Sequence, residues 1–422
     1  MKPSGIEWIG DIPDDWEVTK ISRLYSIQLG KMLQPEKKSS GDTYEPYICA
    51  ANLSSGTFRL DEVKYMWISE PEKDIYRLKR DDLLVTEGGD VGISSIWKDD
   101  ISPCYFQNAL HRVVPKKGNS NRFLHYWLIV LKSVGYIDLI CNKSTIAHFT
   151  KEKFAQSLIL SAPLQTQQRI ADYLDEKCGE IDATIAKQKE IIEKLKAYKQ
   201  SLISETVTKG LDKSAPLKPS GIEWIGDIPD DWEVRKLLSI FKEHKDRNKN
   251  LEEQNLLSLS YGKIKRKDIN NNDGLLPASF ETYNIVENGD IVFRLTDLQN
   301  DKRSLRTGIV TQRGIITSAY VTIRPKIRLD SRFFHYLYHM YDICKVFYGM
   351  GDGVRQGMGF EDLKNIPTLI PPLKTQQKIA DYLDSKCSQI DKYITEKQNI
   401  IQKLDAYKKS LIFECVTGKQ KM

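Results

Sequence analysis

The sequence predicts an α+β fold with an internal pseudo-twofold repeat, in which two mixed α/β domains are separated by two long antiparallel coiled-coil helices. Two observations lead to this prediction. Blocks of sequence from the first half of the 422-residue chain recur in the second half. One of these blocks carries apolar residues at heptad spacing, which is typical of a coiled-coil helix.

The first repeat is a tryptophan block, KPSGIEWIGDIPDDWEV, which occupies residues 2–18 and returns letter for letter at 218–234. Pro13 and Pro229 exclude a long helix there. We expect an extended segment whose tryptophans anchor the start of each module against the scaffold. The tryptophans concerned are Trp8, Trp16, Trp224 and Trp232.

The second repeat begins as PLQTQQRIADYLDEKC at 163–178 and returns as PLKTQQKIADYLDSKC at 372–387. Between the repeats, segments 19–162 and 235–371 share little beyond a similar spacing of apolar residues. A duplicated protein whose halves drifted apart is one interpretation, but drift should not preserve one block while it erases its neighbour. We therefore interpret the chain as one scaffold that carries two different modules.

These boundaries divide the chain into four parts. Residues 1–162 contain the first tryptophan block and the first variable domain, and 163–210 form a long helix. Residues 211–371 contain the second tryptophan block and the second variable domain, and 372–422 form the second long helix.

Each long helix should span about 40 residues, or roughly 60 Å. A helix with one apolar stripe must bury that stripe against a partner. Since the chain has two copies, we expect them to pair with each other, and a homodimeric coiled coil is the alternative. Gln188, Lys199, Lys397 and Lys408 interrupt the seam. Its packing residues are Leu174, Ile181, Ile185, Ile192, Leu195 and Leu202 in the first helix, and Leu383, Ile390, Ile394, Ile401, Leu404 and Leu411 in the second.

The variable segments read as mixed α/β domains rich in short strands. Strand signals bounded by glycine, proline or polar residues occur at 82–86, 110–115, 290–294 and 319–325. The motifs RFLHY at 122–126 and RFFHY at 332–336 follow the last strand of each domain, and we expect a helix at each motif.

The composition permits nucleic-acid binding without demanding it. The net charge is +6, from 63 basic and 57 acidic residues, which is a mild excess. The seven cysteines form no CxxC pair, so nothing supports a zinc site or a disulfide scaffold, and we expect a reducing cytoplasm. The start, MKPSGIEW, lacks the pattern of a signal peptide. The most apolar stretch, 123–140, contains charged residues and reads as a buried helix rather than a membrane span.

Catalytic motifs are missing from the sequence. It contains no GxxxxGK[ST] phosphate loop, no GxSxG elbow and no HExxH pair. It also lacks GxGxxG and the [DN]PP[YF] tetrapeptide of adenine methyltransferases. The glycine-rich GDGVRQGMG at 351–359 lacks the strand–helix context of a phosphate site. These observations argue against an enzyme.

The chain resembles the specificity subunit (HsdS) of type I restriction–modification systems over essentially its whole length. The resemblance rests on SGIEWIGDIPDDWEV, on the helix starts PLQTQQRIADYLD and IPPLKTQQKIADYLD, and on the alternation of variable and repeated regions. It implies a non-catalytic subunit with two target recognition domains, each of which reads one half of a split DNA site. It also implies two methyltransferase subunits and motor-nuclease subunits as partners, which hold S-adenosylmethionine, ATP and magnesium. No cofactor is expected in this chain.

Two other classes are less favoured. A fused methyltransferase has neither room nor motif here, and a coiled-coil spacer would leave the two dissimilar domains unexplained. Stacking of the tryptophans on bases is also disfavoured, because two identical blocks cannot discriminate sequence.

Candidate DNA contacts come from residue chemistry and position alone, because the family motifs do not fix them. Arginine and lysine bond guanine edges or phosphates, asparagine and glutamine bond adenine, and hydroxyls adapt to either. Each residue taken singly is also a reasonable solvated surface group. The candidates are Lys31, Thr86, Gln107, Asn108, His111, Arg112, Lys143, Ser144, Thr145 and His148 in the first domain, and Ser258, Ser260, Tyr261, Lys263, Lys265, Arg266, Arg294, Arg303, Arg306, Ser318, Tyr320, Arg355 and Gln356 in the second.

Overall fold

The computed structural model describes residues 1–141, 147–269, 279–298, 305–350 and 357–420. The chain divides into two compact units. The first unit contains Met1–Lys189 and Gln398–Met422, and the second contains Glu190–Lys397. Each unit combines one variable domain with part of both long helices, and the predicted fold class is confirmed. The four-part division by residue stays a prediction.

The first unit is built around a four-stranded antiparallel sheet with the strand order β10-β9-β12-β4. A second sheet has the order β11-β5-β8, and its β11–β5 pair is parallel. The elements in chain order are β1 (Lys2–Pro3), β2 (Asp11–Ile12), β3 (Glu17–Lys20), α1 (Ile21–Leu24), β4 (Tyr25–Leu29), β5 (Thr43–Ile48), β6 (Leu53–Ser54), β7 (Thr57–Phe58), β8 (Lys64–Ile68), α2 (Glu70–Tyr76), β9 (Leu83–Thr86), β10 (Ser94–Ile96), β11 (Tyr105–Phe106), β12 (Leu110–Pro115), α3 (Asn121–Ser133), α4 (Tyr136–Ile140), α5 (Lys151–Gln156) and β13 (Leu158–Ser161).

The second unit repeats the four-stranded sheet, with the order β17-β24-β21-β22, and its described residues form four further strand pairs, β14-β15, β16-β25, β18-β19 and β20-β23. Its elements are β14 (Leu217–Pro219), β15 (Asp227–Pro229), β16 (Glu233–Lys236), β17 (Phe241–Glu243), β18 (Leu257–Ser260), β19 (Lys263–Arg266), β20 (Asn284–Val286), β21 (Ile291–Phe293), β22 (Thr307–Ile309), β23 (Gly314–Ile316), β24 (Val321–Pro325), α7 (Ser331–Ile343), α8 (Phe360–Leu363) and β25 (Pro367–Ile370). The strands and helices predicted at the RF(L/F)HY motifs and before them are confirmed.

Both ends of each variable domain lie in one antiparallel strand pair. Strand β3, at the end of the first tryptophan block, pairs with β13, which directly precedes the first long helix. Strand β16 pairs with β25 in the same way in the second unit. Each variable domain therefore begins and ends at one place, next to the start of a long helix.

The tryptophan blocks are anchored mainly by their second tryptophan. Trp16 is 3% exposed and contacts Phe123 of α3 edge-on, and Trp232 is 1% exposed and contacts Phe333 of α7 in the same way. Trp224 is partly open to solvent and anchors less. The blocks thus fix the start of each module against the RF(L/F)HY helix.

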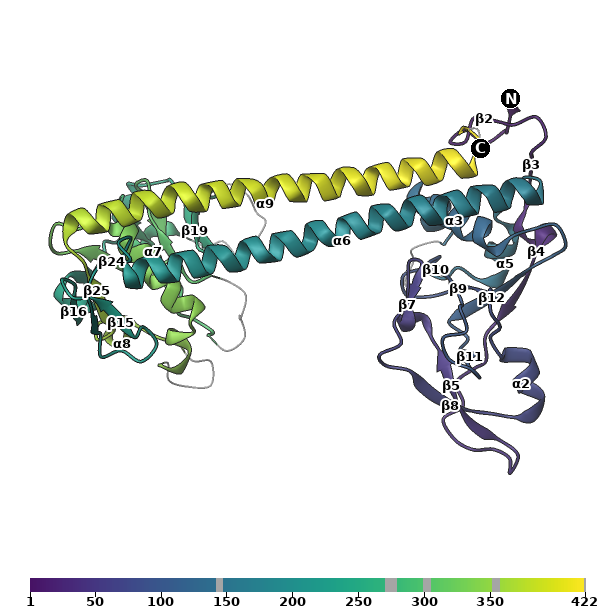
Figure 1. Cartoon of the computed structure of the whole chain (residues 1–422), viewed down its shortest axis with the longest axis horizontal. Coiled ribbons are helices and arrows are strands. Elements are labelled where there is room, and N and C mark those ends of the chain that lie inside the picture. The colour runs from purple at the N-terminus through teal and green to yellow at the C-terminus, as the bar shows by residue number, and fades with distance from the viewer. Residues whose placement is uncertain (142–146, 270–278, 299–304, 351–356, 421–422) are drawn as a thin grey trace. The chain divides into compact units, whose positions relative to one another are not determined.

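The long helices are α6 (Leu164–Lys209) and α9 (Leu373–Val416), of 46 and 44 residues, which Figure 1 shows as continuous ribbons. In the first unit, the start of α6 packs against the end of α9, through residues that include Leu174, Ile181 and Leu411. In the second unit, the end of α6 packs against the start of α9, through residues that include Leu202 and Leu383. The pairing is therefore antiparallel and within one chain, as predicted.

Two of the lysines that interrupt the heptad seam form ion pairs between the helices. Lys408 lies 2.6 Å from Asp182 in the first unit, and Lys199 lies 2.7 Å from Asp391 in the second. A polar group at a seam position costs stability but fixes the register of the partner helix. These pairs occupy corresponding places in the two repeats, so they set the same register twice.

Each RF(L/F)HY helix is held on a long helix by an arginine and a tyrosine, which we call the Arg–Tyr clamp. In the first unit Arg122 donates hydrogen bonds to Asp172 at 2.6 Å and to Asp175 at 2.8 Å. The hydroxyl of Tyr126 donates to Asp175 at 2.6 Å. Both aspartates belong to the repeated ADYLD sequence of α6.

The second unit has the same clamp. Arg332 lies 2.8 Å from both Asp381 and Asp384, and Tyr336 donates to Asp384 at 2.8 Å. The clamp accounts for the conservation of RFxHY and ADYLD between two halves that otherwise differ.

Removing the shared aspartate of one clamp should loosen that module. We expect Asp175→Ala to lower the free energy of unfolding by about 1 kcal/mol, because Arg122 and Tyr126 both lose an acceptor in a partly exposed site. Asp172→Ala removes one exposed contact and should cost less than about 0.5 kcal/mol. Urea unfolding of the full chain measures both, and equal effects would contradict the clamp.

Candidate nucleic-acid interface

The second domain presents its candidate residues on a two-stranded hairpin formed by β18 and β19. Ser258 pairs with Lys265, and Ser260 pairs with Lys263. Directly opposed residues share a face, as do alternate residues along a strand. These four side chains therefore lie on one face of the hairpin, while Leu257 and Leu259, on the other, are buried. Tyr261 stands in the turn, and Arg266 ends β19.

The first domain carries a corresponding hairpin, formed by β6 and β7. Its sequence LSSGTFR at 53–59 matches LSYGKIK at 259–265 in its leucine, serine, glycine and final basic residue. Ser54 pairs with Thr57 across the turn, as Ser260 pairs with Lys263. We call the two segments the recognition hairpins. The same element thus recurs in both variable domains and presents different side chains.

A cleft of about 530 Å³ lies beside the first recognition hairpin. Its lining includes Ser54, Ser55, Arg59 and Gly88. His148 is exposed, and its ring lies 3.8 Å from the place where a Cβ on Gly88 would stand. Ser54, Ser55 and Arg59 were not among the sequence candidates, although the Ser-Gly turn between two apolar residues is a hairpin signal.

Three candidates in the first domain are buried and serve the fold. Lys31 is 6% exposed and pairs with Glu72 at 2.6 Å. The hydroxyl of Thr86 donates to the carbonyl oxygen of Asp90 at 2.6 Å and accepts from the amide of Ile93. The ring of His111 lies fully buried against the carbonyl oxygen of Phe149.

Arg306 is the corresponding case in the second domain. Its guanidinium group is fully buried and donates to the carbonyl oxygens of Arg294, Thr296 and Asp297. Lys31, His111 and Arg306 are therefore held inside their domains, and Thr86 is buried at the edge of the cleft beside the first recognition hairpin. Their contact with bases stays a prediction.

The side chain of Arg112 is also held by contacts within the first domain. Its side chain is 13% exposed and donates to the carbonyl oxygen of Arg77 and to Gln28. Gln107, Asn108, Arg294 and Tyr320 are half-buried, and Ser318 is exposed. Their contact with bases stays a prediction, as does that of the hairpin residues. Lys143, Ser144, Thr145, Arg303, Arg355 and Gln356 lie outside the described residues.

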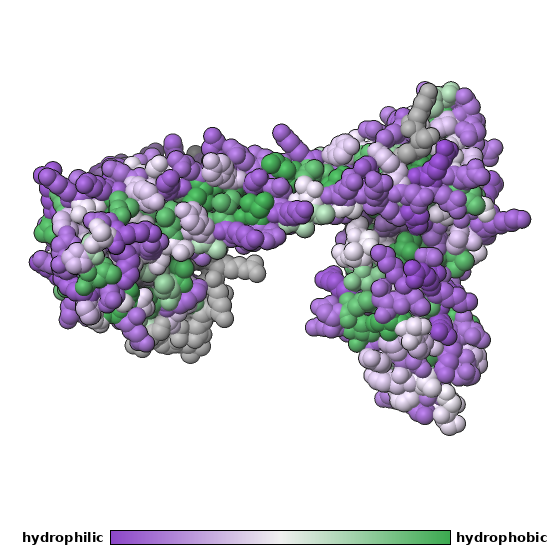
Figure 2. Space-filling model, viewed as in Figure 1, coloured by the Kyte–Doolittle hydropathy of each residue, from purple (hydrophilic) through white to green (hydrophobic). Residues whose placement is uncertain are grey.

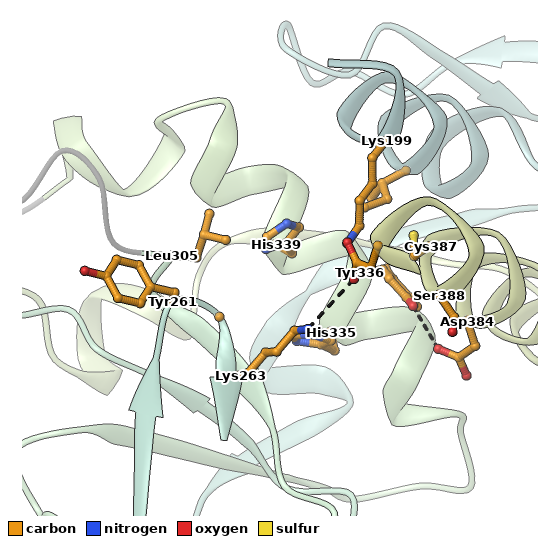
Figure 3. Close-up of a pocket in the computed structure, with 13 residues that line it drawn as sticks. Lys199, Tyr261, Lys263, Leu305, His335, Tyr336, His339, Asp384, Cys387 and Ser388 are labelled. Carbon is orange, nitrogen blue, oxygen red and sulfur yellow. Dashed lines mark hydrogen bonds and ion pairs between the residues drawn. The ribbon is translucent and has the colours of Figure 1, made fainter. Parts of the chain in front are cut away.

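A pocket of about 450 Å³ lies beneath the second recognition hairpin, between α7, α6 and α9 (Figure 3). His335 and His339 line it one helical turn apart. Their Nδ1 atoms are buried and have no hydrogen-bond partner among the described residues. Burial lowers the pKa of His335 to about 3 and that of His339 to about 4.

In the first domain the corresponding histidine has a hydrogen-bond partner. His125 occupies the place of His335 in the RFLHY motif, and its Nδ1 lies 2.9 Å from the hydroxyl of Ser94. Burial lowers the pKa of His125 to about 4. Three histidines under the two recognition hairpins are therefore neutral at pH 7.

These histidines should make the chain sensitive to acid. Their pKa values in the folded state lie below the ordinary value of about 6.5, so the unfolded chain binds more protons below that pH. Their contribution to stability is complete above about pH 6.5 and is lost as the pH falls toward 4.

We expect the free energy of unfolding to fall by on the order of 1 kcal/mol per histidine between pH 7.5 and pH 5. Urea unfolding at several pH values measures this slope. His339→Gln should reduce the slope, and so should His125→Gln. A slope that neither variant alters would contradict the assignment to buried histidines.

The described residues contain no candidate metal centre and no candidate membrane span. No cluster of three or more histidine, cysteine, aspartate or glutamate residues there could hold a metal ion. None of the helices described there combines the length and apolar composition needed to span a bilayer.

Comparison with known proteins identifies the family. The family model described as the type I restriction modification DNA specificity domain matches residues 13–197 and again residues 229–406. The chain belongs to this family. Each match begins inside a tryptophan block and ends inside a long helix, so the family repeat coincides with the internal repeat.

Relatives that match the chain are named as specificity subunits of type I restriction enzymes. The type I restriction enzyme MjaVIII specificity subunit of Methanocaldococcus jannaschii is 24% identical over 97% of this chain and 93% of its own length. The EcoBI specificity subunit of Escherichia coli is 20% identical over 81% of this chain and 74% of its own length. The resemblance inferred from the sequence motifs is confirmed, and the chain is a specificity subunit with DNA-recognition domains.

Solved structures share the fold. A chain from a type I R-M system, solved in work on its complex assembly and conformational transition, has a TM-score of 0.70 at 14% identity, over 97% of this chain and all of that one. The HsdS subunit of Thermoanaerobacter tengcongensis has a TM-score of 0.53 at 13% identity, over 97% of this chain and 98% of that one.

Proposed function

We propose that this specificity subunit reads a split, asymmetric DNA target and directs adenine methylation and restriction by partner subunits. The observation that carries the proposal is the pair of recognition hairpins. One framework, with the same clamp and the same tryptophan block, presents Ser55 and Arg59 in one domain and Tyr261 and Lys265 in the other. Two unlike surfaces on equivalent frameworks fit two unlike half-sites.

The long helices present two equivalent surfaces, to which two copies of one partner could bind. Figure 2 shows apolar surface along them between hydrophilic residues. Ile191 and Tyr198 on α6 are 37% and 57% exposed, and Ile400 and Tyr407 at the corresponding places of α9 are 38% and 56% exposed. Exposed apolar side chains in a repeated arrangement suit two copies of the same protein surface. We assign these patches to two methyltransferase subunits, with motor-nuclease subunits joining the complex.

In this proposal the chain positions DNA and the partners carry out the chemistry. S-adenosylmethionine, ATP and magnesium are bound by the partner subunits. The absence of catalytic sequence motifs supports this division of labour. The work of this chain is to hold base edges and phosphates through polar and basic side chains.

Co-expression tests the proposal. The chain is expressed with the neighbouring methyltransferase gene, each gene is also expressed alone, and adenine methylation of host DNA is measured. Methylation should require both genes, and native mass spectrometry should show two methyltransferase copies for each copy of this chain. Sequence-specific methylation by the methyltransferase alone would contradict the proposal.

A further inference from the structure

The turn of the second recognition hairpin has an unusual residue in a demanding conformation. Tyr261 has φ 47° and Gly262 has φ 75°, so both central residues of this two-residue turn are left-handed. Such turns favour Asn-Gly, because an aromatic side chain is strained at positive φ. Strained residues of this kind tend to cluster where function requires a fixed geometry.

Burial of the ring does not explain why a tyrosine occupies this left-handed position. Its side chain is 69% exposed, which makes it one of the most exposed aromatic residues described. In Figure 3 its ring lies near Leu305 and points away from the cluster of Tyr336 and Asp384. The strain at the turn is therefore not offset by packing of the ring in a core.

The surroundings of the ring are basic. Lys263 and Lys265 follow it on the hairpin face opposite the buried leucines, and Arg266 and Lys267 come next, all exposed. Lys263 lies 3.8 Å from Asp391 of α9, so Lys265 is the cation of this face without an acidic partner among the ion pairs of the described residues. An aromatic ring beside a row of cations is the combination that holds a nucleic-acid base while the cations hold phosphates.

The first recognition hairpin supplies an internal comparison. Ser55 occupies the place of Tyr261, and it does not adopt a positive φ. The glycine that follows is shared, and Arg59 stands where Lys265 stands. The frameworks agree and the residue in the turn differs, as expected of a position that sets which bases a domain reads.

We propose that Tyr261 stacks on a base of the second half-site and is a specificity-determining residue of that domain. This inference rests on the proposed function. The left-handed turn holds the ring out from the hairpin, and Lys265 holds a neighbouring phosphate. Insertion of the ring at a base step partly unstacks the step, as with other side-chain wedges.

The test uses the full chain in complex with its methyltransferase, and DNA duplexes that carry the methylated motif. 2-Aminopurine replaces single adenines of the second half-site in turn, because its fluorescence reports unstacking. The variants are Tyr261→Phe, which keeps the ring, Tyr261→Asn, which suits the turn but has no ring, and Tyr261→Ser, which copies the first hairpin. Lys265→Ala is the matched control from the same hairpin.

Tyr261→Phe should retain binding and the fluorescence change at one position. Tyr261→Asn and Tyr261→Ser should weaken specific binding about ten-fold and abolish that change. Tyr261→Asn should also raise the melting temperature by roughly 2 °C, because it relieves strain at the turn. Lys265→Ala should weaken binding to all sequences, reduce the salt dependence by about one ion and leave the fluorescence change intact.

Wild-type affinity and fluorescence in Tyr261→Asn would overturn the inference. So would a lower melting temperature in that variant, which would assign the tyrosine to packing, or loss of the methyltransferase from the complex, which would assign it to a protein contact. If the wild-type complex methylates no defined motif, the proposed function itself fails. If it methylates a motif that Tyr261→Asn still reads, only this inference fails.

Discussion

Replacing residues 19–162 with the corresponding segment of another family member should change one half-site of the target and leave the other intact. The two ends of this segment lie in or next to the β3–β13 pair, so a donor domain can enter there without stretching the scaffold. The second unit has its own strand pair, clamp and tryptophan block, and none of these is altered by the exchange.

The clamp sets a condition for a successful exchange. A donor with arginine and tyrosine at the places of Arg122 and Tyr126 should dock on Asp172 and Asp175 of α6. The readout is the methylated motif of each chimera in the host genome. A chimera in which Arg122 and Tyr126 are replaced by alanine serves as the control and should lose activity. Changes in both half-sites, or failed assembly across several clamp-bearing donors, would contradict independent modules.

Adding one heptad to each long helix, after Glu193 and after Gln402, should lengthen the gap between the half-sites or abolish activity. These insertion points correspond to each other in the two repeats and lie inside α6 and α9. Seven residues keep the apolar seam in phase and add roughly 10 Å to each helix. That length equals about three base pairs at 3.4 Å per step.

The same insertion also changes the angle at which the second half-site would be met. Three base pairs rotate B-form DNA by about a third of a turn. Methyltransferase binding should survive, since the exposed patches on both helices are kept. Adding two residues instead should destabilise the pair, because it moves the apolar positions and Lys199 and Lys408 out of register. An unchanged motif at full activity in the heptad variant would show that the helices do not set the spacing.

The scaffold could be predicted from sequence because its signals are local and repeated. Heptad positions such as Leu174 and Leu383 have one apolar period over many turns, and the second copy verifies the first. The polar interruptions were less informative. Lys199 and Lys408 break the seam in sequence, and only the structure shows their partners Asp391 and Asp182.

The burial of the candidate residues was predicted less well than the scaffold, because polar residues near strand ends can be either exposed or enclosed by distant partners. Lys31 is buried since Glu72, 41 residues away in the chain, compensates its charge. Arg306 is buried since carbonyl oxygens of the 294–297 segment accept from its guanidinium group. Composition cannot reveal such distant partners, so both resembled surface cations.

The recognition hairpins show the opposite error. The residues of the second were chosen for their chemistry, and strand pairing does place Ser258, Ser260, Lys263 and Lys265 on one face. The residues of the first were not among the candidates, because serines and a single arginine carry a weak chemical signal. Its correspondence with the second hairpin appears only when the two domains are compared element by element.

The form of the methylated motif tests the central claim most directly. The chain is co-expressed with its methyltransferase, and every methylated adenine in the host genome is mapped. Two dissimilar domains on one repeated scaffold predict a single motif of two unlike half-sites, separated by an unread gap of fixed length. A palindromic motif, or a continuous one without a gap, would contradict the account.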